Sequence, residues 1–210
     1  MPPESAGSTG TRPLRPLTLY GHPVLMAPAA PVEVFDAELG QLVEDMFATM
    51  YAAPGVGLAA TQVGVSLRLF TFDCGPGRKG HVCNPVLETV RGELREADEG
   101  CLSVPGLYVA TVRSMEARVT GLDADGHPVE YEGREVLAQC LQHEYDHLDG
   151  MLYLDRLGGR TKRKAMQAVR EAPWFGEQLR ELSPTAPGMR WERSDDGRWT
   201  SVSTPGEVTE

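Results

Sequence analysis

The sequence predicts an α+β fold in which antiparallel strands pack around a central helix, with one further helix toward the N-terminus and one toward the C-terminus. One helical pattern precedes a group of strand-like runs, and two helical patterns follow it, which favours α+β over a βαβ alternation. Asp125-Gly126 marks a tight hairpin between two of the runs, so their strands are antiparallel. The chain has 210 residues, 41% of them hydrophobic, which is enough for one globular domain with a core.

Three helices follow from the spacing of apolar residues. The first spans residues 36–52, with Asp36 as its N-cap. The second spans residues 134–148 and carries the strongest chemical motif in the chain. The third spans residues 161–171 and is ended by Pro173.

Strand-like runs fill the middle of the chain, and the two ends have a different composition. The runs are residues 67–72, 81–88, 114–121 and 127–132. Residues 1–16 are rich in Pro, Ser, Gly and Thr, and we expect a mobile leader there. Residues 17–182 form the expected catalytic domain. Residues 183–210 are a tail in which Trp191 and Trp199 could pack back as a hairpin, with Asp196-Gly197 as its turn.

Composition and charge narrow the class of protein. The formal net charge is −10, which opposes general nucleic-acid binding and predicts no DNA partner. No apolar run reaches the ~18 residues that a membrane span needs, and the N-terminus shows no secretion signal. The four cysteines form no CxxC pair, which is typical of a reducing compartment, so we expect the cytoplasm.

The motif HExxH occupies residues 143–147, within the second predicted helix. Side chains four residues apart lie on one face of a helix, so His143 and His147 can reach a single metal ion. Glu144 is placed to take a proton from a metal-bound water without binding the metal itself. The simpler alternative is two surface histidines beside a salt-bridging glutamate. The position of the motif in the best amphipathic helix favours a metal-dependent hydrolase.

A catalytic metal usually has three protein ligands and one open position, so a third ligand is needed. Cys101 lies in a short, loop-like, glycine-flanked segment, where a thiolate can approach a metal closely. A small buried hydrophobe is the alternative interpretation of this cysteine. Two other ligand sets stay open at this stage. Glu171 would be the third ligand of a metalloprotease, and Cys83 or Cys140 would close a non-catalytic site.

Residues 55–62, GVGLAATQ, form a third notable segment. It is not a phosphate loop, because no Lys-Ser/Thr follows the glycines. Small residues followed by Gln62 suit a tight backbone against a substrate, with an amide donor that points inward. A plain glycine turn after the first helix is the alternative.

GVGLAATQ, EGCLS at residues 99–103 and QHEYDH at residues 142–147 occur intact and in this order. Together they resemble the three signature motifs of the peptide deformylase family, and the resemblance spans about residues 17–170. It implies an enzyme that removes the formyl group from the N-terminal methionine of newly made polypeptides and releases formate.

The resemblance also implies a role for each motif residue. The implied metal ligands are Cys101, His143 and His147, with a metal-bound water as the fourth. Glu144 would act as general base and then deliver the proton to the leaving amine. The side-chain amide of Gln62 and the backbone N–H of Leu102 would stabilise the oxyanion of the tetrahedral intermediate.

A methionine-sized pocket beside the second helix is implied as well. Its walls would include Val56, Val136, Cys140 and His143. Three glycines would line the edge where the peptide backbone lies like an added strand: Gly57, Gly100 and Gly106. Glu99 and Arg113 are expected either to form an ion pair that orients the cysteine segment or to be ordinary surface charges.

The cofactor and partners follow from the same resemblance. The Cys/His/His set suits Fe²⁺, Zn²⁺, Co²⁺ or Ni²⁺. The resemblance favours Fe²⁺ in the cell, with the other ions as alternatives in a purified sample. Formyl-Met nascent peptides are the expected partners. The third helix carries Lys162, Arg163, Lys164 and Arg170. A solvated face is the simpler interpretation of these charges, and docking on ribosomal RNA is the alternative that the resemblance suggests.

Overall fold

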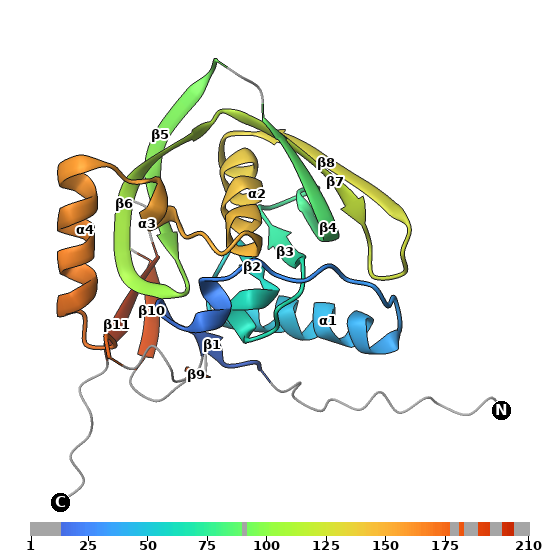
Figure 1. The fold of residues 1–210 in the computed structure, drawn as a ribbon, viewed down its shortest axis with the longest axis horizontal. Helices are drawn as coiled ribbons and strands as arrows, with labels where there is room; N and C mark the ends of the chain where they lie inside the picture. Colours follow the sequence, from blue (N-terminus) through green and yellow to red (C-terminus); the bar gives the residue numbers. More distant parts are fainter. Residues whose placement is uncertain (1–13, 90–91, 177–180, 183–188, 194–198, 204–210) are drawn as a thin grey trace, which may run out of the picture.

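The computed structural model describes residues 14–89, 92–176, 181–182, 189–193 and 199–203 (Figure 1). It confirms the predicted α+β fold of antiparallel strands around a central helix. The helices are α1 (Ala37–Ala52), α2 (Glu135–Leu148), α3 (Tyr153–Arg156) and α4 (Gly159–Glu171), and two 3-10 turns are η1 (Pro23–Leu25) and η2 (Ala60–Val63). None of the helices in the described ranges is long and apolar enough to cross a membrane.

The larger sheet has five strands in the order β2-β3-β4-β7-β8, and every neighbouring pair is antiparallel. Its strands are β2 (Gly57–Ala59), β3 (Leu69–Asp73), β4 (Lys79–Thr89), β7 (Glu116–Leu122) and β8 (Pro128–Arg134). The hairpin predicted at Asp125-Gly126 is confirmed between β7 and β8. Gly126 has a φ of 81°, a left-handed conformation that glycine adopts without strain.

A second sheet consists of β5 (Leu94–Cys101) and β6 (Val104–Ser114), two long antiparallel strands that the sequence pattern did not predict. The segment around Cys101 was expected to be a loop. The structure instead makes Cys101 the last residue of β5, and only Leu102 and Ser103 form the turn into β6. The register of the pair shifts between Glu99 and Cys101, which marks a β-bulge next to the thiol.

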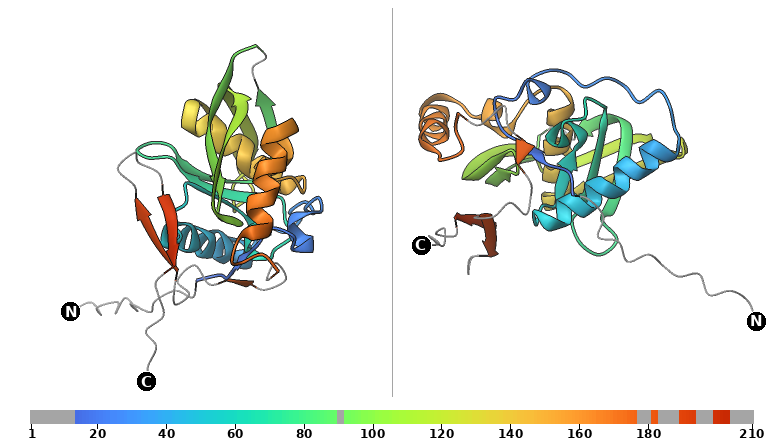
Figure 2. Two further views of the ribbon diagram at one scale, coloured as in Figure 1. Left: turned by 90° about the vertical axis from the view of Figure 1, so that its left-hand side faces the viewer. Right: turned by 90° about the horizontal axis from the view of Figure 1, so that it is seen from below.

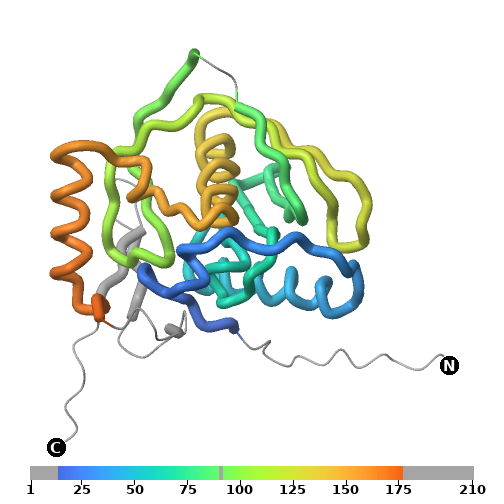
Figure 3. The backbone as a smooth tube through the Cα atoms, in the orientation of Figure 1, coloured from blue at the N-terminus to red at the C-terminus, as the bar shows by residue number. Residues whose placement is uncertain are grey.

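Helix α2 lies between the two sheets (Figure 1). Its inner face packs on the five-stranded sheet in one apolar cluster, which includes Phe70, Phe72, Val82, Val119, Leu137, Leu141 and Leu148. Figure 3 shows the segment between η1 and α1 running across the C-terminal end of α2, where Ala29 N donates to Leu148 O at 2.9 Å. Gly150 follows this end with a φ of 72°, and a Cβ there would lie 2.8 Å from the backbone of Ala27. These contacts fix the C-terminal end of the motif-bearing helix.

Helix α1 begins as predicted, because the Asp36 carboxylate accepts from the backbone N–H groups of Glu38 and Leu39, each at 3.0 Å. Helix α4 packs on the outer side of β6 (Figure 2), where Ala165, Val169 and Trp174 join the same apolar cluster as Cys101 and Val104. A stable α4 therefore supports the strand turn that carries the thiol.

The chain ends were predicted as a leader and a tail. Residues 1–13 lie outside the described ranges, whereas Arg15 already bonds to Asp45 of α1 at 3.0 Å. Near the other end, β1 (Leu17–Thr18) pairs with β9 (Glu181–Leu182), and β10 (Met189–Arg193) pairs antiparallel with β11 (Trp199–Ser203). The predicted turn at Asp196-Gly197 lies outside the described residues, so the packed-hairpin tail stays a prediction.

Candidate active site

Helix α2 presents His143 and His147 on one face, as their four-residue spacing predicts. The two ring centroids are 5.0 Å apart with an interplanar angle of 76°. Both side chains are buried, with exposed fractions of 8% for His143 and 0% for His147. Histidines in such a setting must have partners other than water, since a buried polar group without one is unfavourable.

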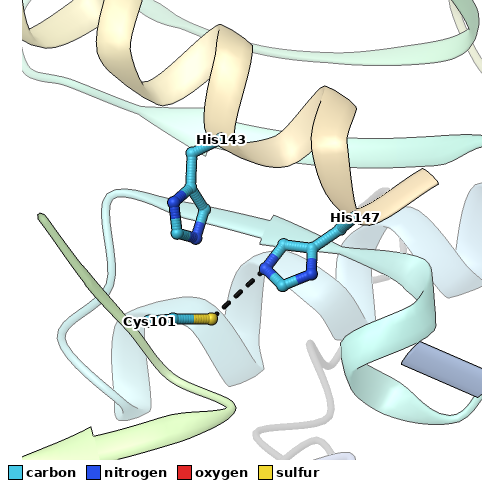
Figure 4. Close-up of side chains that lie close together, drawn as sticks. All are labelled: Cys101, His143 and His147. Atoms are coloured by element: carbon cyan, nitrogen blue, oxygen red, sulfur yellow. Dashed lines mark hydrogen bonds between the residues drawn. The ribbon is translucent and has the colours of Figure 1, made fainter. Parts of the chain in front are cut away.

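Cys101 meets the two histidines from the end of β5 (Figure 4). Its Sγ lies 3.2 Å from Nε2 of His147. One ligand atom from each of Cys101, His143 and His147 falls within a set whose members are all within 4.8 Å of one another. In a tetrahedral site with bonds of about 2.0–2.3 Å, ligand atoms lie about 3.5 Å apart. The separations in this cluster fit three ligands of one ion.

The chemistry of the three donors also fits a metal. Burial is the larger cause and the nearby His143 the second of a pKa of His147 that lies well below its usual range. This imidazole is therefore neutral. Its Nε2 lies beside Cys101 Sγ and is therefore the ring nitrogen that a metal at this cluster would bind. Thiolate and imidazole are the donors that zinc and iron prefer.

The alternative ligands do not join this group. Among the described residues, the only other cluster with metal-ligand spacing is Asp123, Asp125 and His127, on the exposed β7–β8 turn. Glu171 lies on the exposed face of α4, where it accepts from Gln167 at 2.8 Å. The metalloprotease and closed-site alternatives therefore find no support in the geometry.

Glu144 lies beside the cluster with an exposed fraction of 3%. Its Oε2 is buried and lacks a hydrogen-bond partner in the described part of the chain. Burial raises the pKa of Glu144 to about 7. The backbone of Gly57 comes so close that a Cβ at this position would overlap the Glu144 carboxylate and lie 2.9 Å from Cys140 Sγ. The absence of a side chain at residue 57 is therefore what leaves room for the carboxylate.

Gln62 approaches the cluster from η2 and is almost fully buried. Its Nε2 lies 3.4 Å from Cys101 Sγ and 3.3 Å from Ser103 Oγ, while its Oε1 accepts from Ala59 N at 2.8 Å. The amide is thus locked with its donor end toward the thiol, as the inward-pointing prediction requires. Leu102 follows the thiol and lines the same cavity.

A network of buried charges contacts Nδ1 of His143. Of the two alternatives that the sequence left open for Glu99 and Arg113, the structure shows the ion pair, with N–O distances of 3.0 and 2.5 Å. Oε1 of Glu99 also lies 2.6 Å from Nδ1 of His143, a contact that the sequence pattern did not reveal. Burial alone raises the pKa of Glu99, but His143 and Arg113 outweigh it and hold the pKa well below its usual range. Glu99 is therefore an anion that fixes the ring of His143.

A cavity of about 450 Å³ opens onto this cluster. It is lined by all six predicted substrate-binding residues, which are Val56, Gly57, Gly100, Gly106, Val136 and Cys140. His143, Glu144 and Gln62 lie on its wall, whereas His147 does not. The structure adds Arg95, Ala97, Leu107, Tyr108 and Gln139, which no motif marked. They come from β5, β6 and α2, and only the pairing of those strands brings them together.

A buried thiol, two imidazoles, an adjacent carboxylate and an open cavity define a metal-dependent hydrolase. The family model described as polypeptide deformylase matches residues 14–163. The chain belongs to this family. It is therefore a metal-dependent enzyme that removes the formyl group from the N-terminal methionine of newly made polypeptides.

Relatives and solved structures agree with this assignment. A peptide deformylase of Acidothermus cellulolyticus is 50% identical over 167 residues, which cover 80% of this chain and 92% of the relative. Peptide deformylase 2 of Streptomyces coelicolor is 52% identical over 165 residues, covering 77% and 92%. The crystal structure of peptide deformylase from Thermus thermophilus superposes with a TM-score of 0.74 at 43% identity, covering 80% of this chain and 100% of that one.

Proposed function

We propose that Cys101, His143 and His147 hold one divalent metal ion and that Glu144 is the proton-transfer residue of deformylation. The observation that carries this proposal is the convergence of three donor atoms within 4.8 Å of one another. Beside them lies a buried carboxylate oxygen that has no partner among the described residues. A ligand set with three protein donors leaves a position open for chemistry.

The bound metal would supply Lewis acidity, which polarises the formyl carbonyl and makes a water more acidic. Glu144 accepts the proton that this water loses as its oxygen bonds to the formyl carbon. The carboxyl group then delivers the proton to the amine nitrogen of methionine as the C–N bond breaks. The products are formate and a free N-terminus, so atoms and charge balance.

Gln62 and the backbone N–H of Leu102 would donate hydrogen bonds to the developing oxyanion. The fixed amide of Gln62 supports this role because its donor end faces the thiol proposed as a metal ligand, with Nε2 3.4 Å from Cys101 Sγ. Such a donor needs no reorganisation when charge develops, which is the source of its catalytic value.

We propose that the methionine side chain enters the cavity between Val56, Val136 and Cys140. The peptide backbone would lie along Gly57, Gly100 and Gly106, whose small size leaves main-chain groups accessible to an added strand. The cavity volume of about 450 Å³ suits a side chain of this size with the first residues of a peptide.

We propose Fe²⁺ as the ion in the cell, with Zn²⁺, Ni²⁺ or Co²⁺ able to replace it in a purified sample. The proposed location is the cytoplasm, where nascent formyl-Met chains arise. The four buried free thiols, Cys74, Cys83, Cys101 and Cys140, support a reducing compartment.

Docking on the ribosome through α4 is a further part of the proposal. The helix buries Ala165 and Val169 and leaves the basic residues Arg160, Arg163, Lys164 and Arg170 exposed. A basic face of this kind suits the phosphates of ribosomal RNA. Because α4 shares a core cluster with Cys101, deleting it would damage the active site as well.

Charge reversal is therefore the sharper test of docking. Arg163→Glu with Lys164→Glu should reduce co-sedimentation with ribosomes at low salt and leave deformylation of a free peptide unchanged. The matched control makes the same charge change at exposed Arg78, just before β4, and at exposed Lys79, the first residue of β4. Equal co-sedimentation of both variants and the unmodified protein would refute docking through α4.

The main proposal is tested by formate release from a formyl-Met peptide with anaerobically purified protein. Glu144→Ala should retain the metal of the unmodified protein while its turnover falls by about 10²–10⁴-fold. Retained turnover in this variant would refute the role of Glu144. Metal analysis of Cys101→Ala and Glu171→Ala compares the two candidate third ligands. Only Cys101→Ala should lose the metal.

A further inference from the structure

We propose that Arg156, the partly exposed last residue of α3, is a positioning residue for the metal ligand His143. It would act from the surface through a chain of buried charges formed by Asp146, Arg113 and Glu99. The inference rests on the proposed ligand role of His143. It assigns to deformylation a residue that lies outside the three motifs and does not line the catalytic cavity.

The chain of contacts begins at the surface. Nε of Arg156 donates to Oδ2 of Asp146 at 3.0 Å, and its second terminal nitrogen donates to Oδ1 at 2.5 Å. A guanidinium that grips both oxygens of a carboxylate fixes its orientation as well as neutralising it. The Arg156 side chain is 45% exposed, whereas that of Asp146 is 3% exposed. The pair therefore joins the protein surface to its interior.

Asp146 connects Arg156 to the buried charges nearer the active site. Its Oδ2 also accepts from Arg113 at 2.5 Å, and Arg113 in turn donates to both oxygens of Glu99, at 3.0 and 2.5 Å. Oε1 of Glu99 lies 2.6 Å from Nδ1 of His143. Four consecutive close contacts thus connect Arg156 to the imidazole, and every member between these two ends is buried.

The charges in this chain alternate and cancel. Arg156 and Arg113 are cations, and Asp146 and Glu99 are anions, so the four carry no net charge. A buried carboxylate that loses a partner is strongly unfavourable, because the remaining interactions must offset its desolvation. Without Arg156, the single guanidinium of Arg113 would have to neutralise two buried carboxylates. We expect Arg113 to shift toward Asp146 and to hold Glu99, and thereby His143, less firmly.

A second contact ties the same short helix to the same ligand. Tyr153, three residues before Arg156, stacks on the ring of His143 with a centroid distance of 6.2 Å and an interplanar angle of 27°. The Tyr153 hydroxyl donates to Leu107 O at 2.9 Å, which anchors the ring. Helix α3 therefore contacts His143 directly through Tyr153 and indirectly through Arg156.

An ordinary surface ion pair would behave differently. Such a pair contributes little to folding and has no reason to change metal binding. A residue that orients a metal ligand through hydrogen bonds instead changes metal affinity, typically by 10–100-fold. Metal affinity therefore separates the two interpretations, and loss of stability alone does not.

The experiment measures the Zn²⁺ dissociation constant by chelator competition, together with kcat and KM for a formyl-Met peptide. Arg156→Ala should weaken Zn²⁺ binding by about 10-fold. Its kcat should fall several-fold with KM unchanged. Arg156→Lys, which keeps the charge but not the two-pronged contact, should recover part of the loss. Arg118→Ala is the matched control, because Arg118 is 42% exposed and pairs with Glu130 on the surface. It should behave like the unmodified protein.

A double-mutant cycle tests the path itself. In an Asp146→Asn background, Arg156→Ala should cause little further loss of Zn²⁺ affinity, because the link is already broken. Fully additive losses would overturn the proposed path, and a Zn²⁺ affinity of Arg156→Ala within twofold of the unmodified protein would overturn the inference. His143→Ala separates failure of this inference from failure of the proposed function. If it binds Zn²⁺ normally, the ligand assignment is wrong; if it alone loses Zn²⁺, only the role of Arg156 is wrong.

Discussion

Nδ1 of His143 lies 2.6 Å from Oε1 of Glu99, and that carboxylate is held in turn by Arg113. A hydrogen bond from Nδ1–H to an anion leaves Nε2 of the ring available as a ligand atom. Glu99 is two residues before Cys101 on β5, so one strand supplies both the thiol and the group that orients the first imidazole. The proposed metal site thus depends on the register of β5 as well as on α2.

Replacing Glu99 with glutamine should weaken metal binding by about 10–100-fold, since the neutral amide holds the His143 ring less firmly. Chelator competition with Zn²⁺ measures this change. Glu96→Gln, an exposed position on the same strand, is the control and should have no effect. An unchanged Zn²⁺ affinity in Glu99→Gln would show that the contact does not support the ligand.

Replacing Gln62 with leucine should lower kcat by about 10²–10³-fold with little change in KM, because an oxyanion donor acts mainly in the transition state. Steady-state kinetics on a formyl-Met peptide provides the measurement. Ser103→Ala removes only one acceptor of the same amide, so its loss should be much smaller. A large KM effect in Gln62→Leu would instead assign the amide to ground-state binding.

Gly57→Ala should reduce turnover by at least about 10²-fold, because the added Cβ would overlap the Glu144 carboxylate and displace the proton-transfer group. Gly40→Ala in α1 has nothing within 4 Å of the added Cβ and serves as the control. It should leave turnover unchanged and stabilise the helix by about 0.5–1 kcal/mol. Normal turnover in Gly57→Ala would mean that Glu144 has room to move.

His81 should make stability depend on pH. Its Nε2 accepts from Ala124 N at 2.9 Å, and burial lowers the pKa of His81 although Asp123, Asp125 and Glu44 act in the opposite direction. The folded protein therefore holds a neutral ring, whereas the unfolded chain binds a proton below its pKa of about 6.5. The stabilising contribution is complete above that pH and is lost as the pH falls.

Urea unfolding at pH 7.5 and at pH 5.5 measures this effect. The free energy of unfolding should fall less between these two values in His81→Gln than in the unmodified protein. His127, on the exposed turn, provides the control substitution His127→Gln. An identical pH dependence in all three proteins would contradict the role of His81.

The sequence predicted those elements that depend on interactions between residues close together in the chain. The cap at Asp36, the helical spacing of α2 and the Asp-Gly turn between β7 and β8 depend on neighbouring residues, and the structure confirms all three. Strands β5 and β6 were not predicted. The sequence of β5, LREADEGC, is largely charged and lacks the alternation of apolar and polar residues that is typical of a strand. Its stability comes from pairing with β6, which a single strand does not reveal.

In the candidate site, too, local motifs were predictable and contacts between distant residues were not. The motifs predicted the three proposed metal ligands, and the cavity is lined by all six residues predicted to bind the substrate. The bonds of Asp146 to Arg113 and of Glu99 to His143 join residues 33 and 44 positions apart, so no local pattern could mark them. Asp146 lies inside the HExxH motif at a position that the motif leaves open, and its burial between Arg113 and Arg156 is what points to the role we propose for it.

The central claim is that one thiolate from β5 and two imidazoles from α2 bind a single ion. X-ray absorption spectroscopy of the zinc-loaded protein tests it most directly, because it counts sulfur and nitrogen neighbours of the metal. We expect one sulfur at about 2.3 Å and two imidazole nitrogens at about 2.0–2.1 Å, with one lighter atom completing the shell. A zinc site with no sulfur, or with two or more, would contradict the account.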